Sequence, residues 1–288
     1  MEKPVNFAGQ LALATNISLK ISVIFTTYNS PAWLEKVLWG FHYQTDGNFE
    51  LVIADDGSGD ETGAVIESFR HNSHLDIMHV WQEDDGFQKC RILNKAIVTG
   101  RGDYIVMTDG DCIPRNDFVA VHREYAEPGY FLSGGYVKLP LAISEAITRK
   151  DIAEGRCFDQ QWLRDKGFRP PLKITATRRQ AVIFNHLTLT NRTWNGHNAS
   201  CFKRDALMVN GFDERMKYGG LDCEFGGRLL NAGIKARQIR YSAICVHLDH
   251  ARGYVNDEDW RNNRVIRKTS IREKLIETPQ GIRQQSAS

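Results

Sequence analysis

Two aspartates, Asp109 and Asp111, are separated only by Gly110 and follow an apolar run from Ile105 to Met107. Such a run is typical of a short buried strand. Two carboxylates held close together raise each other's pKa, so the pair is favoured where a cation lies between it and a polyanion. Mg²⁺ and Mn²⁺ prefer oxygen ligands and commonly bridge carboxylates to phosphates. We therefore predict a divalent metal site at this strand end, with Gly110 leaving room for metal and phosphate; an ordinary polar loop is the alternative.

Three further residues could contribute to the same chemistry from the second half of the sequence. Asp222 follows Gly219-Gly220 at the start of a helical pattern. The helix dipole favours its ionised form, which could accept a proton from a substrate hydroxyl; helix capping alone is the alternative. His247 follows the apolar run Ile244–Val246, and His250 comes three residues later. A histidine at a strand end can complete an octahedral metal site, although a lone histidine is usually structural.

Strand and helix patterns alternate through the first half of the chain. Strands are expected over Ile21–Thr27, Phe49–Ala54, Ile77–Trp81 and Ile105–Met107. Helices are expected from Pro31, over Glu61–Phe69, and around Leu93, Ala96 and Ile97. This alternation predicts an α/β fold with a Rossmann-like, mostly parallel sheet flanked by helices. Because parallel sheets bind ligands outside the carboxyl ends of their strands, residues near Thr26, Asp56 and Asp109 should converge in one crevice.

Several classes of function are excluded or disfavoured. Neither a Gly-x-Gly-x-x-Gly motif after the first strand nor a phosphate-binding loop ending in Gly-Lys-Ser/Thr is present, so a nucleotide held through a metal fits better. The formal net charge of +2 is too small to indicate a nucleic-acid partner. No apolar run approaches the roughly 18–20 residues that span a bilayer, and no secretory signal is recognised. Six scattered cysteines without a Cys-x-x-Cys pair predict reduced thiols in a cytoplasmic protein.

The second half is less regular. Tyr130–Val137 is expected to form one strand, whereas residues 138–180 have no clear pattern. An irregular segment of that length is uncommon unless it serves binding. Residues 257–277 begin with acids and continue with basic residues, the order that a helix dipole favours. This tail is expected to be either a surface helix or a peripheral contact with an anionic membrane.

Five parts of the sequence, taken in order, form a recognisable series: ISVIFTTYN (21–29), VIADDGS (52–58), Asn94, TDGD (108–111) and GGLDCEF (219–225). This series resembles family 2 glycosyltransferases of the GT-A fold, and the similarity extends over about residues 20–250. It resembles in particular bacterial enzymes similar to the N-acetylgalactosaminyl-transferring half of chondroitin polymerase, with a C-terminal segment similar to β-1,4-galactosyltransferases. It implies one GT-A domain over residues 1–288: a nucleotide-sugar half (20–137), an acceptor and catalytic half (138–250) and a basic helical tail (251–288).

The resemblance also implies roles for individual residues. Asp222 would be the catalytic base, and Asp111 would coordinate Mn²⁺ or Mg²⁺ together with His247, or with His250 in its place. Four residues would contact the nucleotide-sugar donor. Thr26 and Tyr28 would line the base pocket, Asp56 would hydrogen-bond the base, and Asp109 would contact the ribose or sugar. Trp194 and residues 196–200 would form the floor of the sugar site. The remaining expected donor contacts are Lys89, Arg91, Asn94, Asn198 and Glu224.

The chain departs from the family pattern at two positions. Leu221 replaces a glutamate that can position a sugar, and Gln88 replaces an arginine, so that Lys89 or Arg91 would have to take over a phosphate contact.

The expected activity is inverting, metal-dependent transfer of a sugar from a nucleotide-sugar, with UDP favoured, to a saccharide or lipid-linked acceptor of bacterial surface polysaccharide synthesis.

Two other functions stay open at this point. A nucleotidyltransferase that makes sugar nucleotides would share the sheet and the metal, but it would carry a basic glycine-rich loop after the first strand. A degenerate protein that only binds nucleotide-sugars is consistent with Leu221 and Gln88. The expected location is cytoplasmic, or peripheral on the inner face of the plasma membrane, and the oligomeric state is open.

Overall fold

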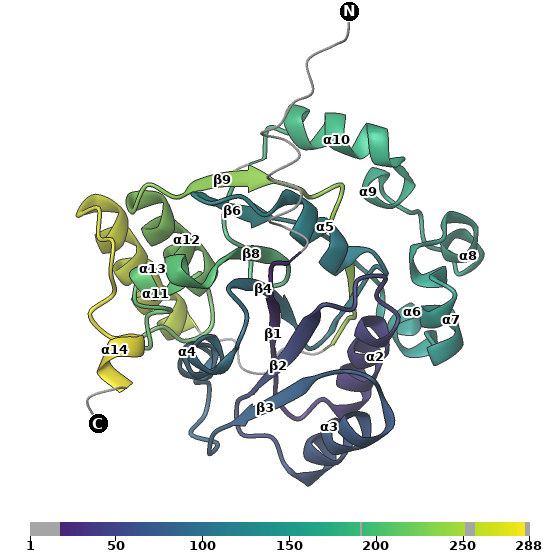
Figure 1. The fold of residues 1–288 in the computed structure, drawn as a ribbon, viewed down its shortest axis with the longest axis horizontal. Coiled ribbons are helices and arrows are strands. Elements are labelled where there is room, and N and C mark those ends of the chain that lie inside the picture. Colours follow the sequence, from purple (N-terminus) through teal and green to yellow (C-terminus); the bar gives the residue numbers. More distant parts are fainter. Residues whose placement is uncertain (1–17, 191, 251–256, 286–288) are drawn as a thin grey trace, which may run out of the picture.

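The computed structural model describes residues 18–190, 192–250 and 257–285. A central sheet with strand order β3-β2-β1-β4-β8-β6-β9 crosses the molecule, and a smaller sheet has the order β5-β10-β7 (Figure 1). The first strands are β1 (Ile21–Thr27), β2 (Phe49–Asp55), β3 (Ile77–Trp81) and β4 (Tyr104–Asp109), and they pair in parallel. The predicted α/β fold with a mostly parallel sheet is confirmed.

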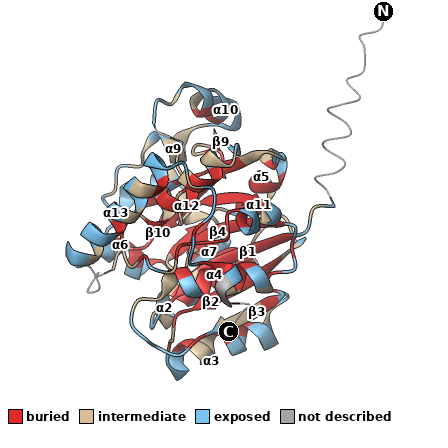
Figure 2. Ribbon diagram, turned by 90° about the vertical axis from the view of Figure 1, so that its left-hand side faces the viewer, coloured by how far each residue is buried: buried red, intermediate tan, exposed pale blue. Residues whose placement is uncertain are grey.

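The parallel strands form because their residues are apolar on both faces, as expected when helices cover both sides of a sheet. Val23 and Phe25 of β1 pack into one core cluster and Ile24 packs into the other. Figure 2 shows the strands as the most deeply buried part of the molecule. One face is covered by α2 (Pro31–His42), α3 (Asp60–Asn72) and α5 (Phe118–Tyr125), and the other by α4 (Lys89–Thr99).

The second half departs from the sequence prediction in two ways. The expected single strand over Tyr130–Val137 is divided at Gly134 into β6 (Tyr130–Ser133) and β7 (Gly135–Lys138), which belong to different sheets. Gly134 is required because a Cβ atom there would lie 2.0–2.4 Å from the side-chain amide atoms of Asn198. Strand β8 (Ala199–Phe202) runs antiparallel to β4, so the sheet is mixed.

The segment that lacked a clear pattern is a series of short helices. They are α6 (Leu141–Ala146), α7 (Arg149–Ala153), the 3-10 turn Arg156–Phe158, α8 (Gln160–Asp165), α9 (Leu172–Thr175) and α10 (Arg178–Leu187). Capping boxes start two of them, Thr148 with Asp151 at α7 and Thr177 with Gln180 at α10. Helices this short show little apolar periodicity, so the sequence pattern did not predict them. Their capping residues mark where two of them begin.

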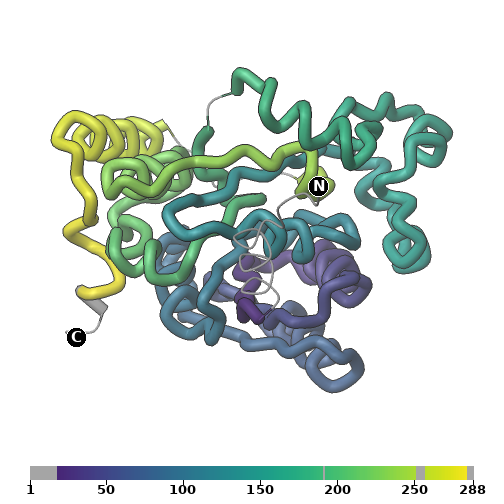
Figure 3. The backbone as a smooth tube through the Cα atoms, turned by 45° about the horizontal axis from the view of Figure 1, so that its top comes forward, coloured from purple at the N-terminus to yellow at the C-terminus, as the bar shows by residue number. Residues whose placement is uncertain are grey.

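The remaining elements complete both sheets and the C-terminal side of the molecule. They are β5 (Cys112–Pro114), α11 (Lys203–Met208), α12 (Leu221–Asn231), β9 (Lys235–Gln238), β10 (Ile244–His247), α13 (Asp257–Arg272) and α14 (Ile282–Gln285). Helix α13 ends earlier than the tail helix expected over 257–277 and lies along α12 (Figures 1 and 3). Within the described residues, no helix is both long and apolar enough to span a bilayer. All six cysteines are unpaired, as predicted.

Candidate active site

The carboxyl ends of three neighbouring strands bring the predicted polar residues together. In the ladder between β1 and β2, Thr27 pairs with Asp55, and in the ladder between β1 and β4, Thr26 pairs with Asp109. Asp56 follows β2 directly, and its backbone N–H donates to Thr27 O at 3.1 Å. The register of the sheet therefore places these side chains at one edge, as expected for ligand binding in an α/β fold.

Gly110 has a structural role at the end of β4. Its backbone N–H donates to Thr26 O at 2.9 Å, and a Cβ atom at this position would lie 2.6 Å from the same oxygen. The absence of a side chain therefore lets the turn after β4 approach the backbone of β1. That Gly110 also leaves room for metal and phosphate stays a prediction.

Lys89, the first residue of α4, is the cation at the centre of the site. Its Nζ lies 2.7 Å from Asp109 Oδ1, and its charge also interacts with Asp222 and Asp111. Although burial favours the neutral amine, these carboxylates hold the pKa of Lys89 above its usual value. The pKa of Asp109 is lowered by Lys89 despite burial of the carboxylate. Lys89 and Asp109 are therefore both charged.

Asp222 joins this cluster from the second residue of α12. Burial raises the pKa of Asp222 to about 6; the charge of Asp109 adds to the shift, and the charge of Lys89 opposes it. A Cβ atom at position 196 would lie 2.6 Å from Asp222 Oδ1, so the carboxylate occupies space that only Gly196 leaves. Within the described residues, this buried Oδ1 has no hydrogen-bond partner. Asp222 can therefore carry a proton near neutral pH.

Asp111, His247 and His250 form a possible metal centre beside this cluster. Asp111 Oδ2 lies 3.5 Å from His247 Nε2 and 2.8 Å from His250 Nε2. The end of β10 is fixed there because Leu248 N–H donates to Asp111 O at 2.9 Å. A carboxylate with two imidazoles suits Mn²⁺ better than Mg²⁺, which favours oxygen ligands. Cys112 Sγ also lies close, but a thiol suits softer metals.

The structure adds two aromatic residues to those predicted from the sequence. The rings of Tyr136 and His197 are 4.1 Å apart, and the ring of Tyr136 is 6.1 Å from that of His247. Burial lowers the pKa of His197 to about 4, which keeps it neutral at physiological pH. His197 lies in the predicted 196–200 segment, whereas Tyr136 could have been found only from its position on the strand beside β10.

The donor-side residues form a second group around the end of β2. Asp56 accepts hydrogen bonds from Gln82 Nε2 at 2.6 Å and from the backbone N–H of Gln88 at 2.9 Å, and burial raises its pKa. Gln88 thus contributes its backbone rather than a substitute for the family's arginine. The hydroxyl of Tyr28 donates to Asp84 at 2.8 Å and its ring is half exposed, which suits a base-stacking surface. Arg91 is exposed on α4.

Four of the residues predicted to contact the donor are nearly or fully buried: Asn94, Asn198, Glu224 and Trp194. The side-chain amide of Asn94 bonds the backbone of Phe212, and that of Asn198 bonds Gly135 and Ala243. All four therefore have a structural role in the interior, and their contact with the donor stays a prediction.

The last two of these side chains form part of the packing around α12. Glu224 forms an ion pair with buried Arg228 at 2.8 Å and accepts a hydrogen bond from Ser270 Oγ at 2.8 Å. Trp194 packs against Phe225 with ring centres 4.9 Å apart. Leu221 is buried in the same apolar cluster, which accounts for an apolar residue at that position. These contacts hold the helix that carries Asp222.

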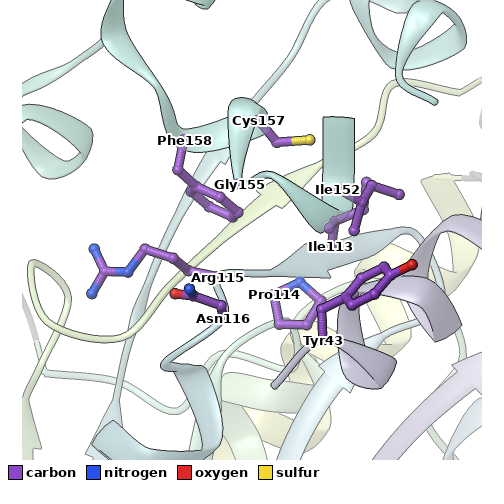
Figure 4. A pocket seen from close by; sticks show the side chains of 10 residues that line it. Tyr43, Ile113, Pro114, Arg115, Asn116, Ile152, Gly155, Cys157 and Phe158 are labelled. Atoms are coloured by element: carbon purple, nitrogen blue, oxygen red, sulfur yellow. The ribbon is translucent and has the colours of Figure 1, made fainter. Parts of the chain in front are cut away.

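A pocket near β5 contains none of the predicted site residues. It is lined by Gly40, Tyr43, Ile113, Pro114, Arg115, Asn116, Ile152, Gly155, Cys157 and Phe158 (Figure 4). Arg115, its cation, is already paired with Asp117 at 2.6 Å and also bonds Ser242 O. This pocket is therefore separate from the strand-end cluster.

Comparison with known proteins shows which family the sequence is similar to. Residues 22–139 match the model of the family described as glycosyl transferase family 2. The chain is 27% identical over 277 residues to the uncharacterized glycosyltransferase YfnE of Bacillus subtilis, covering 85% of this chain and 69% of that protein. It is 25% identical over 283 residues to a chondroitin synthase of Pasteurella multocida, covering 90% of this chain but only 28% of the synthase.

Solved structures show the same architecture. A mannosyltransferase from Pyrobaculum calidifontis, in complex with GDP-Man and Mn²⁺, matches with a TM-score of 0.55 and 21% identity over 89% of this chain and 68% of that one. The 1–349 fragment of S. aureus TarS in complex with UDP-GlcNAc matches with a TM-score of 0.55 and 16% identity over 89% and 69% of the respective chains. The chain thus has the GT-A fold, and its first half is similar in sequence to family 2 glycosyltransferases.

Proposed function

We propose that the protein transfers a sugar, with inversion and with the help of a divalent metal, from a nucleotide-sugar to a saccharide hydroxyl. The observation that carries the proposal is the position of Asp222, a half-buried carboxylate with an enclosed Oδ1, whose pKa is raised to about 6 and whose charge interacts with Lys89 and Asp109. A general base works best when its pKa is close to the working pH. Asp222 meets this requirement beside the candidate metal centre.

In the proposed reaction, Asp222 takes the proton of the acceptor hydroxyl as its oxygen attacks the anomeric carbon. The bond from that carbon to the diphosphate breaks on the opposite side, and the electron pair leaves with the nucleoside diphosphate. Lys89, which is paired with Asp109 at 2.7 Å, can orient that carboxylate toward the ribose or sugar and offer a positive charge to the diphosphate. Neutral His197 can bond substrate without adding charge.

Asp111 and His247 would hold Mn²⁺ or Mg²⁺, with His250 as a further ligand. The donor set fits a divalent cation, and His247 Nδ1 is buried without a partner among the described residues, leaving Nε2 as the nitrogen facing Asp111. When bound, the metal would neutralise the charge that develops on the leaving diphosphate. The complex of the Pyrobaculum mannosyltransferase with GDP-Man and Mn²⁺ supports this assignment.

The nucleotide and acceptor are proposed from the relatives. UDP is favoured because TarS was solved with UDP-GlcNAc, although the mannosyltransferase was solved with GDP-Man. Tyr28 and Thr26 would line the base pocket, with Asp56 bonding the base and Arg91 available at its rim. The chondroitin and hyaluronan synthases among the relatives favour a saccharide or lipid-linked acceptor in bacterial surface polysaccharide synthesis.

A panel of nucleotide-sugars tests this proposal. With Mn²⁺ and a mixture of simple glycosides, one member should yield the nucleoside diphosphate and a glycosylated product. Release of pyrophosphate from a nucleoside triphosphate and a sugar phosphate would favour the nucleotidyltransferase alternative. Binding of a nucleotide-sugar without either reaction would favour the degenerate, binding-only alternative.

Peripheral contact with an anionic membrane is also part of the proposal, with a cytoplasmic location consistent with six free thiols. Two helices offer suitable surfaces. On α13, the apolar side chains of Val265 and Ile271 are exposed among basic residues. On α10, Ile183 and Leu187 are exposed, and the same helix begins with the exposed arginines Arg178 and Arg179. Sedimentation with vesicles containing phosphatidylglycerol should detect the contact, and charge-introducing changes at Ile183 or Val265 should show which helix makes it.

A further inference from the structure

A pair of cations without acidic partners lies beside the metal centre. Lys173, on α9, donates to Tyr136 O at 3.1 Å, and its Nζ is 5.6 Å from the centre of the Tyr136 ring. Arg240 is next to the same strand: a Cβ atom on Gly135 would lie 2.0 Å from Arg240 O. Burial is the main cause of the lowered pKa of Lys173, and the charge of Arg240 adds to it, so the two charges interact. Lys173 Nζ and the backbone of Arg240 therefore both lie against the Gly135-Tyr136 segment.

This arrangement costs free energy unless something compensates it. Two like charges at short range repel each other, and the repulsion increases as water is excluded. Among the described residues, neither Lys173 nor Arg240 forms an ion pair with a carboxylate, and Arg240 Nε is buried without a hydrogen-bond partner. Asp249, which follows β10, is already paired with Lys138 at 2.8 Å. The protein thus leaves two positive charges uncompensated at this position.

The location indicates which substrate would supply the missing charge. Strand β7, which carries Tyr136, lies beyond β10 in the small sheet and therefore on the far side of His247 from β5 and Asp111. The base-binding residues lie at the ends of β1 and β2, in the other sheet. When the donor diphosphate is bound near Asp111, the space on the Tyr136 side of the site is therefore available to the acceptor. The exposed Tyr136 ring can stack on a sugar face.

We infer that Lys173 and Arg240 form an anion subsite that binds a carboxylate or phosphate on the acceptor, with Tyr136 stacking against the adjoining sugar. This inference rests on the proposed transfer reaction and adds an acidic acceptor to it. Arg240 presents the planar donor group suited to a carboxylate or phosphate, and Lys173 supplies a point charge. The two cations select an acceptor; they take no part in breaking or forming bonds.

Direct binding measurements test the subsite separately from catalysis. The probes are methyl β-glucuronide, methyl β-glucoside and methyl β-glucoside 6-phosphate, titrated into the protein with UDP and Mn²⁺ present. The wild type should bind at least one acidic glycoside about tenfold more tightly than the neutral one, as expected for charge-assisted hydrogen bonds. The comparison of glucuronide with phosphate shows which acidic group is preferred. Equal binding of all three glycosides, or no binding, would overturn the inference.

Variants decide whether these two cations are responsible. Lys173→Gln with Arg240→Gln should remove the preference for the acidic glycoside and leave binding of the neutral glycoside unchanged. Lys173→Arg should keep the preference, since it retains the charge, and Arg179→Gln is the matched control because Arg179 is an exposed arginine of the neighbouring helix. A preference that survives the double change would overturn the inference.

UDP titration of the same double variant separates the acceptor from the donor. Unchanged affinity for UDP in the presence of Mn²⁺ supports an acceptor site, whereas a matching loss would assign the cations to the donor diphosphate and overturn the inference. Failure of the proposed function gives a different result: the wild type would bind the acidic glycoside but would transfer no sugar from any nucleotide-sugar.

Discussion

The donor side and the acceptor side of this site are held in different ways. On the donor side, Asp56 and Asp109 lie at or directly after a strand end, so the register of the parallel sheet determines their positions. On the acceptor side, Asp222 depends on Gly196 and on the helix that follows the Gly219-Gly220 turn. The positions of the strand-end residues are therefore stabilised by the main sheet, whereas the position of Asp222 depends on contacts between segments far apart in the sequence. Changes on the two sides should affect different steps of the reaction.

Replacement of the proposed base gives the strongest test of this division. Asp222→Asn keeps the size of the side chain but cannot accept the proton, so turnover should fall by about 10²–10⁴-fold, the usual range for general-base catalysis. Donor affinity should stay within about twofold, because the strand-end residues are unchanged. Steady-state kinetics and calorimetry with UDP and Mn²⁺ measure the two quantities. Turnover close to that of the wild type would remove Asp222 from the role of base.

The opposite result is expected on the donor side. Asp111→Ala removes the carboxylate that lies within 3.5 Å of both His247 and His250, so Mn²⁺ should no longer strengthen UDP binding. The loss should reach about tenfold or more in affinity, as for removal of a charged ligand. Calorimetry with and without Mn²⁺ measures it. A metal effect of full size in this variant would place the metal elsewhere.

The same division explains which features could be predicted from the sequence. The first four strands and their helices were predicted because long buried strands are continuous apolar runs. The convergence of Asp56, Asp109 and Asp111 followed from the rule for parallel sheets. The structural roles of Asn94 and Asn198 could not be predicted, because their partners lie at Phe212, Gly135 and Ala243, far away along the chain. A motif identifies a residue type at a position but does not distinguish a ligand contact from an interior hydrogen bond.

A methyl group at position 196 should affect the acceptor side alone. Gly196→Ala would place a Cβ atom 2.6 Å from Asp222 Oδ1, so the carboxylate must move. A displacement of about 1 Å in a catalytic group can cost on the order of 10²-fold in rate. Turnover should therefore fall while UDP affinity is kept. Gly227→Ala is the matched control, since no atom lies within 4 Å of a Cβ there. Full turnover by Gly196→Ala would show that Asp222 has room to adjust.

The raised pKa of Asp222 predicts two pH effects. Turnover should increase as pH rises through about 6, because only the ionised form accepts a proton. Stability should change in the opposite direction: the folded pKa of about 6 exceeds the ordinary value of 3.8, so ionisation opposes folding as pH rises between them. At 1.36 kcal/mol per pKa unit, the full cost is at most about 3 kcal/mol above pH 6.

Urea unfolding of metal-free Asp222→Asn and wild type measures this cost. The variant should gain stability relative to the wild type as pH rises from about 4 to 6, and the difference should then stay constant. A difference that does not change with pH would mean that Asp222 is already well solvated, and a base with a tuned pKa would no longer describe it.

The smallest expected effect concerns α13, which holds the acceptor side from outside the site. The Nδ2 of Asn263 donates to the backbone oxygens of Lys217, Tyr218 and Gly219 at 3.0, 3.1 and 2.8 Å. Gly219 has φ +109 and lies against Trp260, so this turn has little freedom to find other partners. Asn263→Ala leaves these carbonyls without their donor and should cost about 1–3 kcal/mol of stability.

The effect of Asn263→Ala on activity should be confined to the acceptor side. Because the turn leads directly into the helix of Asp222, Asn263→Ala should lower turnover by a few-fold to about tenfold at temperatures where the protein stays folded, with UDP affinity unchanged. Val265→Ala, at an exposed position of the same helix, is the control. If UDP affinity and turnover fell equally, α13 would support the whole site, and the donor side would depend on long-range contacts as much as the acceptor side does.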